Sequence, residues 1–340
     1  MDRKLETDSS KPQSIVQEAL SRVSALLSAL STASTSTASN PQPEGPPPPP
    51  RGSSSLFSAG SSDKGAPLDP TEFFDPEPQL RAKVRQLAEL VRKADKVVVF
   101  TGAGISTAAG IPDFRGPKGV WTFEARNEKP PPMPSILSVK PTPTHMALVA
   151  MLKHGKLDYV VSQNVDGLHL RSGIPRDQLA ELHGNLNVDR CEGCGEEFYR
   201  SAGKVDWGEA ARKAYRAEMC PACGGRIRDS IVHFGDALPR RAFVSSIHRS
   251  QNCDLGLVLG TSLTVSPACD VPEHVLRRRK PLVIVNLQPT SLDDEATVRI
   301  WARTDRVMEM LCAELGWDVP PTADLDEQLT RSFGRYTLDS

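Results

Sequence analysis

The fold is decided by Lys96-Val-Val-Val-Phe-Thr-Gly-Ala-Gly-Ile-Ser-Thr107, where an apolar run passes directly into a glycine turn. Residues 97–100 are apolar at every position, which predicts a short strand buried on both faces. Glycines after such a strand let the backbone approach a bound phosphate or another segment closely. A glycine loop alone is a weak indication, because many strand-to-helix junctions need glycine only for packing.

The same pattern recurs along the chain at 159–162, 255–259 and 283–285, where short apolar runs end in polar or glycine-containing turns. Helical stretches separate these runs, and apolar residues at helical spacing from Leu80 to Val91 predict an amphipathic helix before the first strand. This alternation predicts an α/β fold, a doubly wound, Rossmann-like parallel sheet with helices on both faces. Ligands bind beyond the carboxyl ends of the strands in such sheets. The turns expected to converge there begin at Gly102, Gln163, Gly260 and Asn286.

Two Cys-x-x-Cys pairs lie further along the chain, Cys191 with Cys194 and Cys220 with Cys223. With 25 residues between the pairs, four thiolates can reach one Zn²⁺ and leave no open position for water. We therefore predict one structural Zn²⁺ that holds a smaller zinc-binding domain, at about residues 184–232. Two disulfides are the alternative, which a reducing intracellular setting disfavours.

The overall composition is that of a soluble globular protein, with 340 residues, 39% apolar residues and a net charge of -1. No stretch approaches the roughly 18 consecutive apolar residues of a membrane helix, and the chain does not open with a secretory signal pattern. We therefore expect an intracellular protein with no membrane partner. The net charge gives no electrostatic argument for direct nucleic-acid binding.

Changes in composition divide the chain into three segments. Residues 1–75 form a Ser/Thr/Pro/Gly-rich leader, which we expect to be disordered because it buries too little apolar surface. Residues 76–317 form a globular domain, and residues 318–340 a polar tail. The leader carries six Lys or Arg against nine Asp or Glu, so it is not a basic nucleic-acid-binding arm. Within it, residues 15–27 have two interpretations, a helix that forms on a partner or a transient helix without function.

One basic cluster, Arg277-Arg-Arg-Lys280, ends a predicted helix just before the strand at 282–286. Cations there face the negative end of the helix dipole, which is a structural role. A nuclear-import sequence and a phosphate contact are the functional interpretations. The sequence leaves this choice open.

Four motifs follow one another in the globular domain: Gly102-Ala-Gly-Ile-Ser-Thr107, Gly110-Ile-Pro-Asp-Phe-Arg-Gly116, Gln163-Asn-Val-Asp-Gly-Leu-His169 and His183-Gly184. With the paired cysteines, they resemble the sirtuin family of NAD-dependent protein deacylases. The resemblance runs from about Pro76 to Leu315. Its class IV branch, which holds sirtuins six and seven, is indicated by Arg115-Gly-Pro-Lys-Gly-Val-Trp121, Arg228-Asp-Ser-Ile-Val-His-Phe-Gly235 and Ile284-Val-Asn-Leu-Gln288.

The resemblance implies that residues 76–317 are a sirtuin catalytic domain, with the zinc module inserted, that consumes NAD as a co-substrate. His183 is the expected general base, because an imidazole titrates near neutrality and can accept a proton from a ribose hydroxyl. Asn164 and Asp166 are expected to line the nicotinamide pocket as further catalytic residues. Structural roles are expected for His145, at a helix start, for His169, in the loop after Asp166, and for His233, in a substrate-side strand.

The resemblance also assigns the contacts with NAD. The amides of Gly102, Ala103 and Gly104 are expected to hold phosphates at the start of a helix. Thr107 replaces the third glycine of the dehydrogenase fingerprint, which argues against hydride transfer. The full expected set is Gly102, Ala103, Gly104, Ser106, Thr107, Asp113, Phe114, Arg115, Trp121, Gln163, Asn164, His183, Gly260, Thr261, Ser262, Asn286 and Gln288.

An acyl-lysine peptide is expected to add as a strand beside the segment from Val232 to Gly235. Val232, Phe234 and Gly235 are the expected substrate-binding residues. The Phe-Gly-Glu usual in the family is Phe-Gly-Asp here, ending at Asp236, which leaves substrate preference open.

These features predict a NAD-dependent protein-lysine deacetylase that acts on histones or other nuclear proteins and releases nicotinamide and O-acetyl-ADP-ribose. The branch resemblance implies a nuclear location, including the nucleolus, and chromatin association, with a cytoplasmic location as the alternative. Long-chain deacylation and mono-ADP-ribosyl transfer are alternative activities of the same site. A NAD-sensing chromatin scaffold is the non-enzymatic alternative, and the complete set of Asn164, Asp166 and His183 argues against it.

Overall fold

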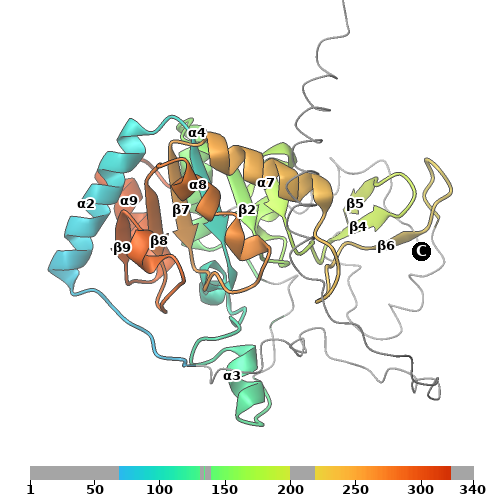
Figure 1. The fold of residues 1–340 in the computed structure, drawn as a ribbon, viewed down its shortest axis with the longest axis horizontal. Coiled ribbons are helices and arrows are strands. Elements are labelled where there is room, and N and C mark those ends of the chain that lie inside the picture. Colours follow the sequence, from blue (N-terminus) through green and yellow to red (C-terminus); the bar gives the residue numbers. More distant parts are fainter. Residues whose placement is uncertain (1–68, 131–133, 135–138, 200–218, 323–340) are drawn as a thin grey trace, which may run out of the picture. The chain divides into compact units, whose positions relative to one another are not determined.

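The computed structural model describes residues 69–130, 134, 139–199 and 219–322 (Figure 1). The segment 15–27 therefore lies outside the described residues, as do most of the expected leader and most of the tail. In the described part of the chain, no helix is both long enough and apolar enough to span a membrane.

A six-stranded parallel sheet forms the centre of the domain. Its strands are β1 (Val97–Thr101), β2 (Leu157–Ser162), β3 (Leu179–Glu181), β7 (Leu255–Leu259), β8 (Leu282–Val285) and β9 (Val298–Ile300). The strand order is β3-β2-β1-β7-β8-β9, and every neighbouring pair is parallel. The predicted doubly wound α/β fold is confirmed, and the predicted strands are β1, β2, β7 and β8.

Helices cover both faces of the sheet because the strands alternate their side chains between two apolar clusters. Val97 and Val99 of β1 belong to one cluster, and Val98 and Phe100 to the other. The first cluster is covered by α2 (Glu77–Lys93), α4 (Pro143–Lys153) and α9 (Thr304–Leu315), and the second by α7 (Arg240–Asn252) and α8 (Glu273–Arg277). Shorter elements are α3 (Val120–Ala125), α5 (Leu168–Ser172) and the 3₁₀ turns η1 (Ala103–Ile105), η2 (Thr107–Ala109), η3 (Arg176–Gln178), η6 (Ala268–Asp270) and η7 (Asp293–Glu295).

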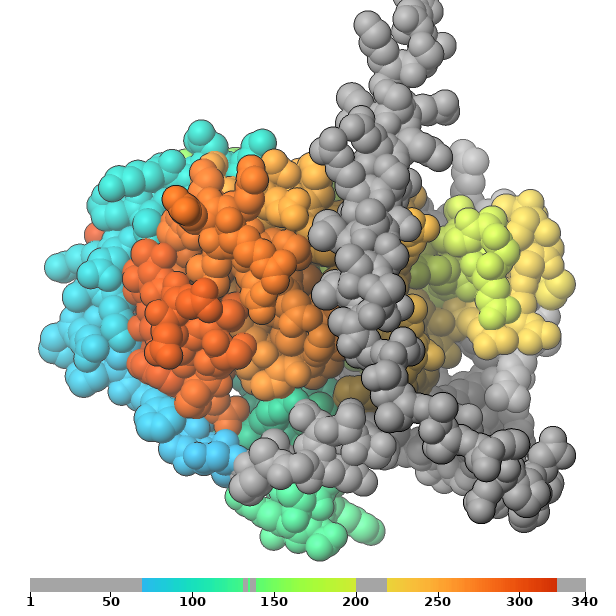
Figure 2. Space-filling view, in the orientation of Figure 1, coloured from blue at the N-terminus to red at the C-terminus, as the bar shows by residue number. Residues whose placement is uncertain are grey.

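The predicted amphipathic helix is α2, which buries Leu80, Val84, Leu87 and Val91. It packs against α9 and β9, and its blue surface adjoins the orange-red surface of the later chain in the space-filling view (Figure 2). Its spacing of apolar residues thus places one face of α2 against the core.

The topological switch of the sheet lies between β1 and β7. The chain passes from β1 to β2 and β3 on one side and later builds β7, β8 and β9 on the other. Because all six strands are parallel, their carboxyl ends share one edge, and the crevice at the switch point is where such folds bind ligands. The turns after β1, β2, β3, β7 and β8 lie at this edge, which we call the carboxyl edge.

A second, three-stranded antiparallel sheet has the order β5-β4-β6. Its strands are β4 (Val188–Cys191), β5 (Glu197–Tyr199) and β6 (Ile227–Asp229), and we call this region the zinc module. Its separate buried apolar cluster consists of Cys191, Phe198, Cys220 and Ile227. Cysteines thus make up half of that cluster in the described chain.

The last part of the expected leader is attached to the domain. Phe73 N–H donates to the carbonyl of Leu287 (2.8 Å), and Asp75 N–H donates to the carbonyl of Trp301 (2.7 Å). The rings of Phe73 and Trp301 also meet edge to face, 5.3 Å apart. Tertiary contacts thus begin at least as early as Asp69, within the expected leader of residues 1–75.

Candidate functional site

Three glycines let two loops cross at the switch point. A Cβ added to Gly104 would lie 2.8 Å from the Cα of Gly260, and one added to Gly102 would lie 2.7 Å from the Gly260 carbonyl oxygen. Gly260 itself has a φ of 60°, in the left-handed region. Larger side chains at these three positions would push apart the loops that follow β1 and β7.

The amides of the glycine loop are mostly used within the protein, which corrects the role expected for them. Gly102 N–H donates to the carbonyl of Leu259 (3.1 Å), and Gly104 N–H donates to the carbonyl of Gly260 (2.9 Å). Of the three expected phosphate donors, only Ala103 N–H has no hydrogen-bond partner among the described residues. The expected helix start is also wrong, because η1 and η2 are single 3₁₀ turns that cannot sum a long helix dipole.

Gln163 connects the strand ends across the switch point. Its N–H donates to the carbonyl of Thr101 (3.0 Å), and its side-chain amide donates to Thr261 Oγ1 (3.1 Å). Thr107, another expected NAD contact, donates its hydroxyl to the carbonyl of Gly104 (3.1 Å). Expected residues from three separate segments, 102–107, 163 and 260–261, therefore meet at the carboxyl edge.

Asn164 and Asp166 hold the glycine loop through their side chains. Asn164 Nδ2 donates to the carbonyl of Gly102 (3.0 Å), and the hydroxyl of Ser106 donates to Asp166 Oδ2 (2.7 Å). Both side chains are buried. Burial raises the pKa of Asp166, and hydrogen bonds from Leu168 N–H and the Ser106 hydroxyl oppose that rise. The observed contacts thus position the loop.

His183 follows β3 and is held in one tautomer. Its Nδ1 lies 3.0 Å from the carbonyl oxygen of Gln163, which can only accept, so Nδ1 carries the proton. Nε2 then has an unshared electron pair and no hydrogen-bond partner among the described residues. Burial lowers the pKa of His183, against a smaller rise from the Gln163 carbonyl. The imidazole is therefore neutral at neutral pH and able to accept a proton at Nε2.

Two other histidines lie behind the glycine loop. His169 Nε2 lies 2.9 Å from Thr101 Oγ1, and His145 Nδ1 lies 2.8 Å from Thr142 Oγ1. Their rings are 4.8 Å apart, and each has one buried nitrogen with no hydrogen-bond partner among the described residues. Burial lowers the pKa of His169 to about 3 and places that of His145 well below its usual value. Both are neutral supports of the loop, as their expected structural roles require.

Aromatic rings contact each other in the segment that follows the glycine loop in sequence. The rings of Phe114 and Trp121 lie 4.9 Å apart, and the Arg115 guanidinium lies 4.3 Å above the Trp121 ring. Arg115 also lies 3.4 Å from Ser262 Oγ, on the loop after β7. Burial raises the pKa of Asp113, and its carboxylate accepts a hydrogen bond from Gly116 N–H (3.0 Å). Contacts thus join Phe114, Arg115 and Trp121, three of the expected residues of this segment.

Asn286 and Gln288 follow β8 at the same edge. Asn286 Nδ2 donates to the carbonyl of Gln288 (2.9 Å). Gln288 Nε2 lies 3.1 Å from the carbonyl oxygens of both Asp69 and Arg115. The side chain of Gln288 therefore joins the ordered part of the leader to the Phe114 segment.

The expected peptide segment is irregular backbone, so the expected strand around His233 is wrong for the chain by itself. Val232 N–H donates to the carbonyl of His183 (3.0 Å), which ties this segment to the expected base. The Phe234 side chain is 57% exposed, and its ring lies 6.3 Å from that of Trp121. Gly235 is exposed as well. A strand here would have to form when a peptide binds.

The four expected zinc ligands form one cluster in the zinc module. The Sγ atoms of Cys191 and Cys223 are 3.5 Å apart, those of Cys194 and Cys220 are 3.6 Å apart, and all four lie within 4.8 Å. A disulfide needs about 2.05 Å between sulfurs, whereas a tetrahedral Zn²⁺ with bonds of about 2.3 Å separates them by about 3.8 Å. A Cβ on Gly225 would lie 2.8 Å from the Cys191 sulfur, so glycine leaves room for the cluster. The donor set fits one structural Zn²⁺.

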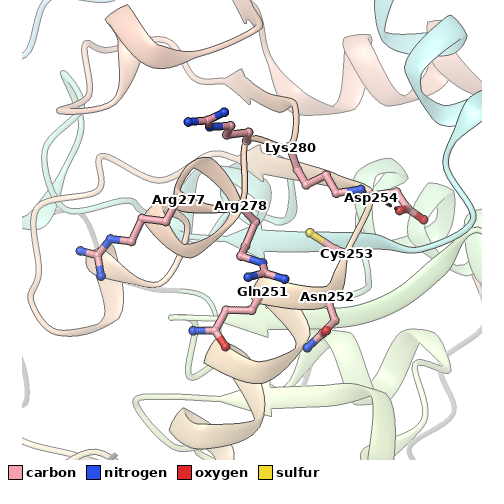
Figure 3. Close-up of a pocket in the computed structure, with 8 residues that line it drawn as sticks. Gln251, Asn252, Cys253, Asp254, Arg277, Arg278 and Lys280 are labelled. Carbon is pink, nitrogen blue, oxygen red and sulfur yellow. Dashed lines mark hydrogen bonds and ion pairs between the residues drawn. The ribbon is translucent and has the colours of Figure 1, made fainter. Parts of the chain in front are cut away.

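The basic cluster lies at the opposite edge of the sheet, before β7 and β8 begin. It borders a hollow of about 380 Å³. Arg277 pairs with Glu273 (2.7 Å) and Lys280 with Asp254 (3.4 Å), and Arg278 extends towards the end of α7 (Figure 3). Both α7 and α8 end here, so the cations face two helix carboxyl ends. This geometry favours the structural interpretation of the cluster.

Sequence reasoning missed several residues that support the site. Thr101 and Thr142 form hydrogen bonds with His169 and His145, behind the glycine loop. Arg176 and Asn185 both contact Glu181, two residues before the expected base. Glu181 lies just before the His183-Gly184 motif, and the sequence motifs gave it no role. Its place two residues before the expected base was the signal that could have identified it.

A doubly wound sheet with crossed glycine loops at its switch point, together with a four-cysteine module, defines an α/β nucleotide-binding class with a zinc-binding insertion. The Sir2 family profile matches residues 131–267. A NAD-dependent protein deacetylase Sirt6 of Drosophila melanogaster is 38% identical over 270 residues, which cover 78% of this chain and 85% of that one. The chain therefore belongs to the Sir2 family, and the predicted family is confirmed.

Further similarities agree with this placement. NAD-dependent protein deacetylase sirtuin-7 of Homo sapiens is 41% identical over 255 residues, covering 72% of this chain and 63% of that one. A solved Sir2-p53 peptide-NAD+ structure has a TM-score of 0.54 and 32% identity, covering 68% of this chain and 98% of that one. NAD-dependent protein deacetylase SRT1 of Arabidopsis thaliana is 43% identical over 259 residues, covering 75% of this chain. The chain spans 54% of the length of that plant relative.

Proposed function

We propose that this protein is a NAD-dependent protein-lysine deacetylase. The observation that carries the proposal is His183, whose Nδ1 is fixed to the Gln163 carbonyl while Nε2 remains an acceptor at the carboxyl edge. The side chain of Gln163 reaches the loop after β7, so the expected base and the crossed glycine loops share one residue. A neutral imidazole in this position suits proton removal from a sugar hydroxyl.

The expected contacts with NAD fall into three groups around this base. The crossed loops around Gly102 and Gly260 would hold the phosphates, with Ala103 N–H, which has no partner in the described part of the chain, as a donor. Asn286 and Gln288 would meet the adenine ribose. Asn164 and Asp166 would close the nicotinamide end while they hold the glycine loop in place.

The reaction follows from the family resemblance. The acetyl-lysine carbonyl oxygen bonds to the ribose carbon as the bond to nicotinamide breaks, which gives an alkylamidate and free nicotinamide. His183 takes the proton of a ribose hydroxyl, whose oxygen then bonds to the amidate carbon. Water supplies the remaining atoms when the lysine amine leaves, so NAD, acetyl-lysine and water give nicotinamide, lysine and O-acetyl-ADP-ribose.

The zinc module would stabilise structure and take no part in the reaction. Four thiolates complete the coordination of Zn²⁺, so the ion would have no position for water or substrate. We also propose the division into a leader, a catalytic domain with this inserted module, and a tail. In this proposal the leader ends before Asp69, and the contacts that begin there support that choice.

Nuclear proteins, histones among them, are the proposed substrates, with chromatin as the proposed setting and the nucleus, including the nucleolus, as the location. The class IV motifs and the similarity to Sirt6 and sirtuin-7 proteins support this choice. The exposed Phe234 and the irregular segment around it leave room for a peptide to add its backbone there. Nucleosomes should therefore be compared with isolated peptides as substrates.

The proposal is tested by following all products together by mass spectrometry. Purified protein is incubated with an acetyl-lysine histone peptide, with and without NAD. We expect equal amounts of nicotinamide, deacetylated peptide and O-acetyl-ADP-ribose, and no deacetylation without NAD. Loss of acetyl groups without NAD would contradict the proposal. Turnover confined to long-chain acyl peptides, or ADP-ribose retained on protein, would instead identify one of the alternative activities.

A further inference from the structure

His183 projects from a tight turn that begins at the last residue of β3. Gly184 N–H donates to the carbonyl of Glu181 (3.2 Å), which closes the turn with His183 at its third position. Gly184 has a φ of 86°, and a Cβ there would collide with the carbonyl of Ser230. The backbone path of the turn is therefore tightly restricted, and its two ends decide where the imidazole points.

A side-chain contact joins the two ends of this turn. Asn185 Nδ2 donates to Glu181 Oε1 over 2.6 Å, and both groups are buried. The backbone of Asn185 is fixed as well, since its N–H donates to Ser230 Oγ (3.0 Å) and its carbonyl accepts from that hydroxyl (2.9 Å). We call the Glu181–Asn185 contact the clasp. It brackets Leu182, His183 and Gly184.

Arg176 connects the clasp to the zinc module. Its NH1 lies 3.1 Å from Glu181 Oε2, while its Nε and NH2 each lie 2.9 Å from an oxygen of Glu197 on β5. Glu197 also accepts from Arg190 of β4 (2.6 Å). A two-pronged arginine contact of this kind fixes orientation as well as distance. The clasp is thus linked through two charged residues to the sheet that carries the cysteines.

We propose that Glu181 is a positioning residue for His183, which closes the clasp over the turn and transmits the order of the zinc module to the base through Arg176. The inference rests on the proposed function, because it assigns His183 the role of base. Glu181 would act through the turn backbone and not on the imidazole directly, since it contacts neither ring nitrogen of His183 among the described hydrogen bonds.

The charges around Glu181 make the clasp sensitive to pH. Its side chain is 3% exposed, and the charged groups that face it are Arg176, Glu197 and Asp166. Burial raises the pKa of Glu181 to about 7, against the lowering effect of Arg176 and the Asn185 amide. Above that pH the carboxylate is ionised and holds both partners. Below it, protonation weakens the pairing with Arg176 and loosens the clasp.

The test compares wild-type protein with Glu181→Gln. Glutamine keeps the size of the side chain, but one carboxylate oxygen becomes an NH₂ group. Because Arg176 and Asn185 both donate to residue 181, glutamine cannot accept from both of them. Small misplacements of a catalytic group cost about 10- to 100-fold, which is the ratio of wild-type to variant kcat that we expect at pH 8.5. With a pKa of about 7, roughly a tenth of Glu181 is still ionised at pH 6, so the ratio there should fall to about 2- to 10-fold. The titration of His183 affects both proteins alike and cancels in the ratio. Zinc content should be unchanged.

A matched control is Glu273→Gln, which removes an exposed carboxylate from the opposite edge and should keep a ratio near one at every pH. Asn185→Ala opens the clasp from its other end and should reproduce the rising ratio. A ratio independent of pH, or wild-type kcat in both clasp variants, would overturn the proposal.

A readout without turnover separates this inference from the proposed function. The ring resonances of His183, assigned by their loss in His183→Ala, should be single in wild type at pH 8.5 and broadened or doubled in Glu181→Gln. Unchanged resonances would overturn the positioning role even if wild type showed no deacetylation. Absence of NAD-dependent products with altered resonances would instead refute only the proposed function.

Discussion

The parallel sheet and the zinc module are stabilised by different means. The sheet has a large apolar cluster on each face, and every residue of β1 and β7 is buried. The apolar cluster of the zinc module has only four described members, two of which are the proposed ligands Cys191 and Cys220. Small units that cannot bury enough surface need metals or disulfides. The comparison indicates that burial holds the site in the sheet, whereas a metal must hold its neighbouring module.

Removing zinc should have the largest effect on stability, and it should unfold the zinc module while the parallel sheet stays folded. Structural Zn²⁺ contributes about 10 kcal/mol or more to the folding of small zinc-binding peptides. A chelator should therefore abolish amide protection in β4, β5 and β6 while β1 and β7 keep theirs. Hydrogen exchange with mass spectrometry measures both regions at once.

A module that stayed protected without zinc would contradict this account. The same would follow if β1 lost its protection together with the module. Replacing Cys269, which lies outside the cluster of ligands, with alanine provides the control and should leave zinc content unchanged.

Within the sheet, the crossed glycine loops should be the most sensitive place. Gly260→Ala places a Cβ 2.7 Å from Ile105 N and also strains a left-handed residue. Gly316→Ala is the matched control, since Gly316 has a similar φ of 69° but an added Cβ there would meet no described atom within 4 Å. We expect a loss of about 1 kcal/mol in unfolding free energy for the control and about 1–3 kcal/mol more for Gly260→Ala. Equal losses in urea unfolding would show that the loops can separate without cost.

The buried histidines should make the sheet sensitive to acid. The pKa of His169 is about 3 in the folded chain, below an unfolded value of 6.5. As pH falls from 8 to 5, the unfolded chain binds a proton that the folded chain refuses. Stability from this group, fully present above pH 6.5, should therefore fall by about 2 kcal/mol. Urea unfolding of wild type and His169→Gln should show the stability gap shrinking by that amount, and parallel pH curves would contradict the assignment.

The exposed basic cluster, which lies outside both apolar cores, should have the smallest effect on stability. Arg278 is exposed, beside the ends of α7 and α8. Arg278→Ala should change the unfolding free energy by less than about 0.5 kcal/mol and leave deacetylation unchanged. A marked loss of binding to a DNA duplex in this variant would instead favour the phosphate-contact interpretation of the basic cluster.

The sequence predicted the parts of the fold that rest on local pattern. Continuous apolar runs identified β1, β2, β7 and β8, and helical spacing identified α2. The three-residue strands β3 and β9 at the sheet margins were missed, because so short a segment has too little periodicity to recognise. The cysteine spacing predicted the cluster, since four thiolates with two-residue gaps have few other uses.

The side-chain partners in the site could not be predicted in the same way. The amides of Gly102 and Gly104 were expected to be phosphate donors, but Leu259, at the end of β7, and Gly260, in the loop after it, accept their hydrogen bonds. That loop is distant in sequence, so only the folded chain reveals the contact. The same is true of Arg176, which contacts Glu181 of β3 and Glu197 of β5 and so connects the two sheets. Motifs indicated which residues gather, whereas tertiary structure decided which hydrogen bonds they use.

The central claim is that His183 is the base of a NAD-dependent deacetylase, and paired histidine variants test it most directly. His183→Ala should lower kcat about 10²- to 10⁴-fold with NAD binding and zinc content retained, as expected when a general base is lost. His248→Ala, which removes an exposed imidazole from α7, should keep wild-type turnover. Wild-type kcat in His183→Ala, measured with an acetyl-lysine peptide and saturating NAD, would contradict the account.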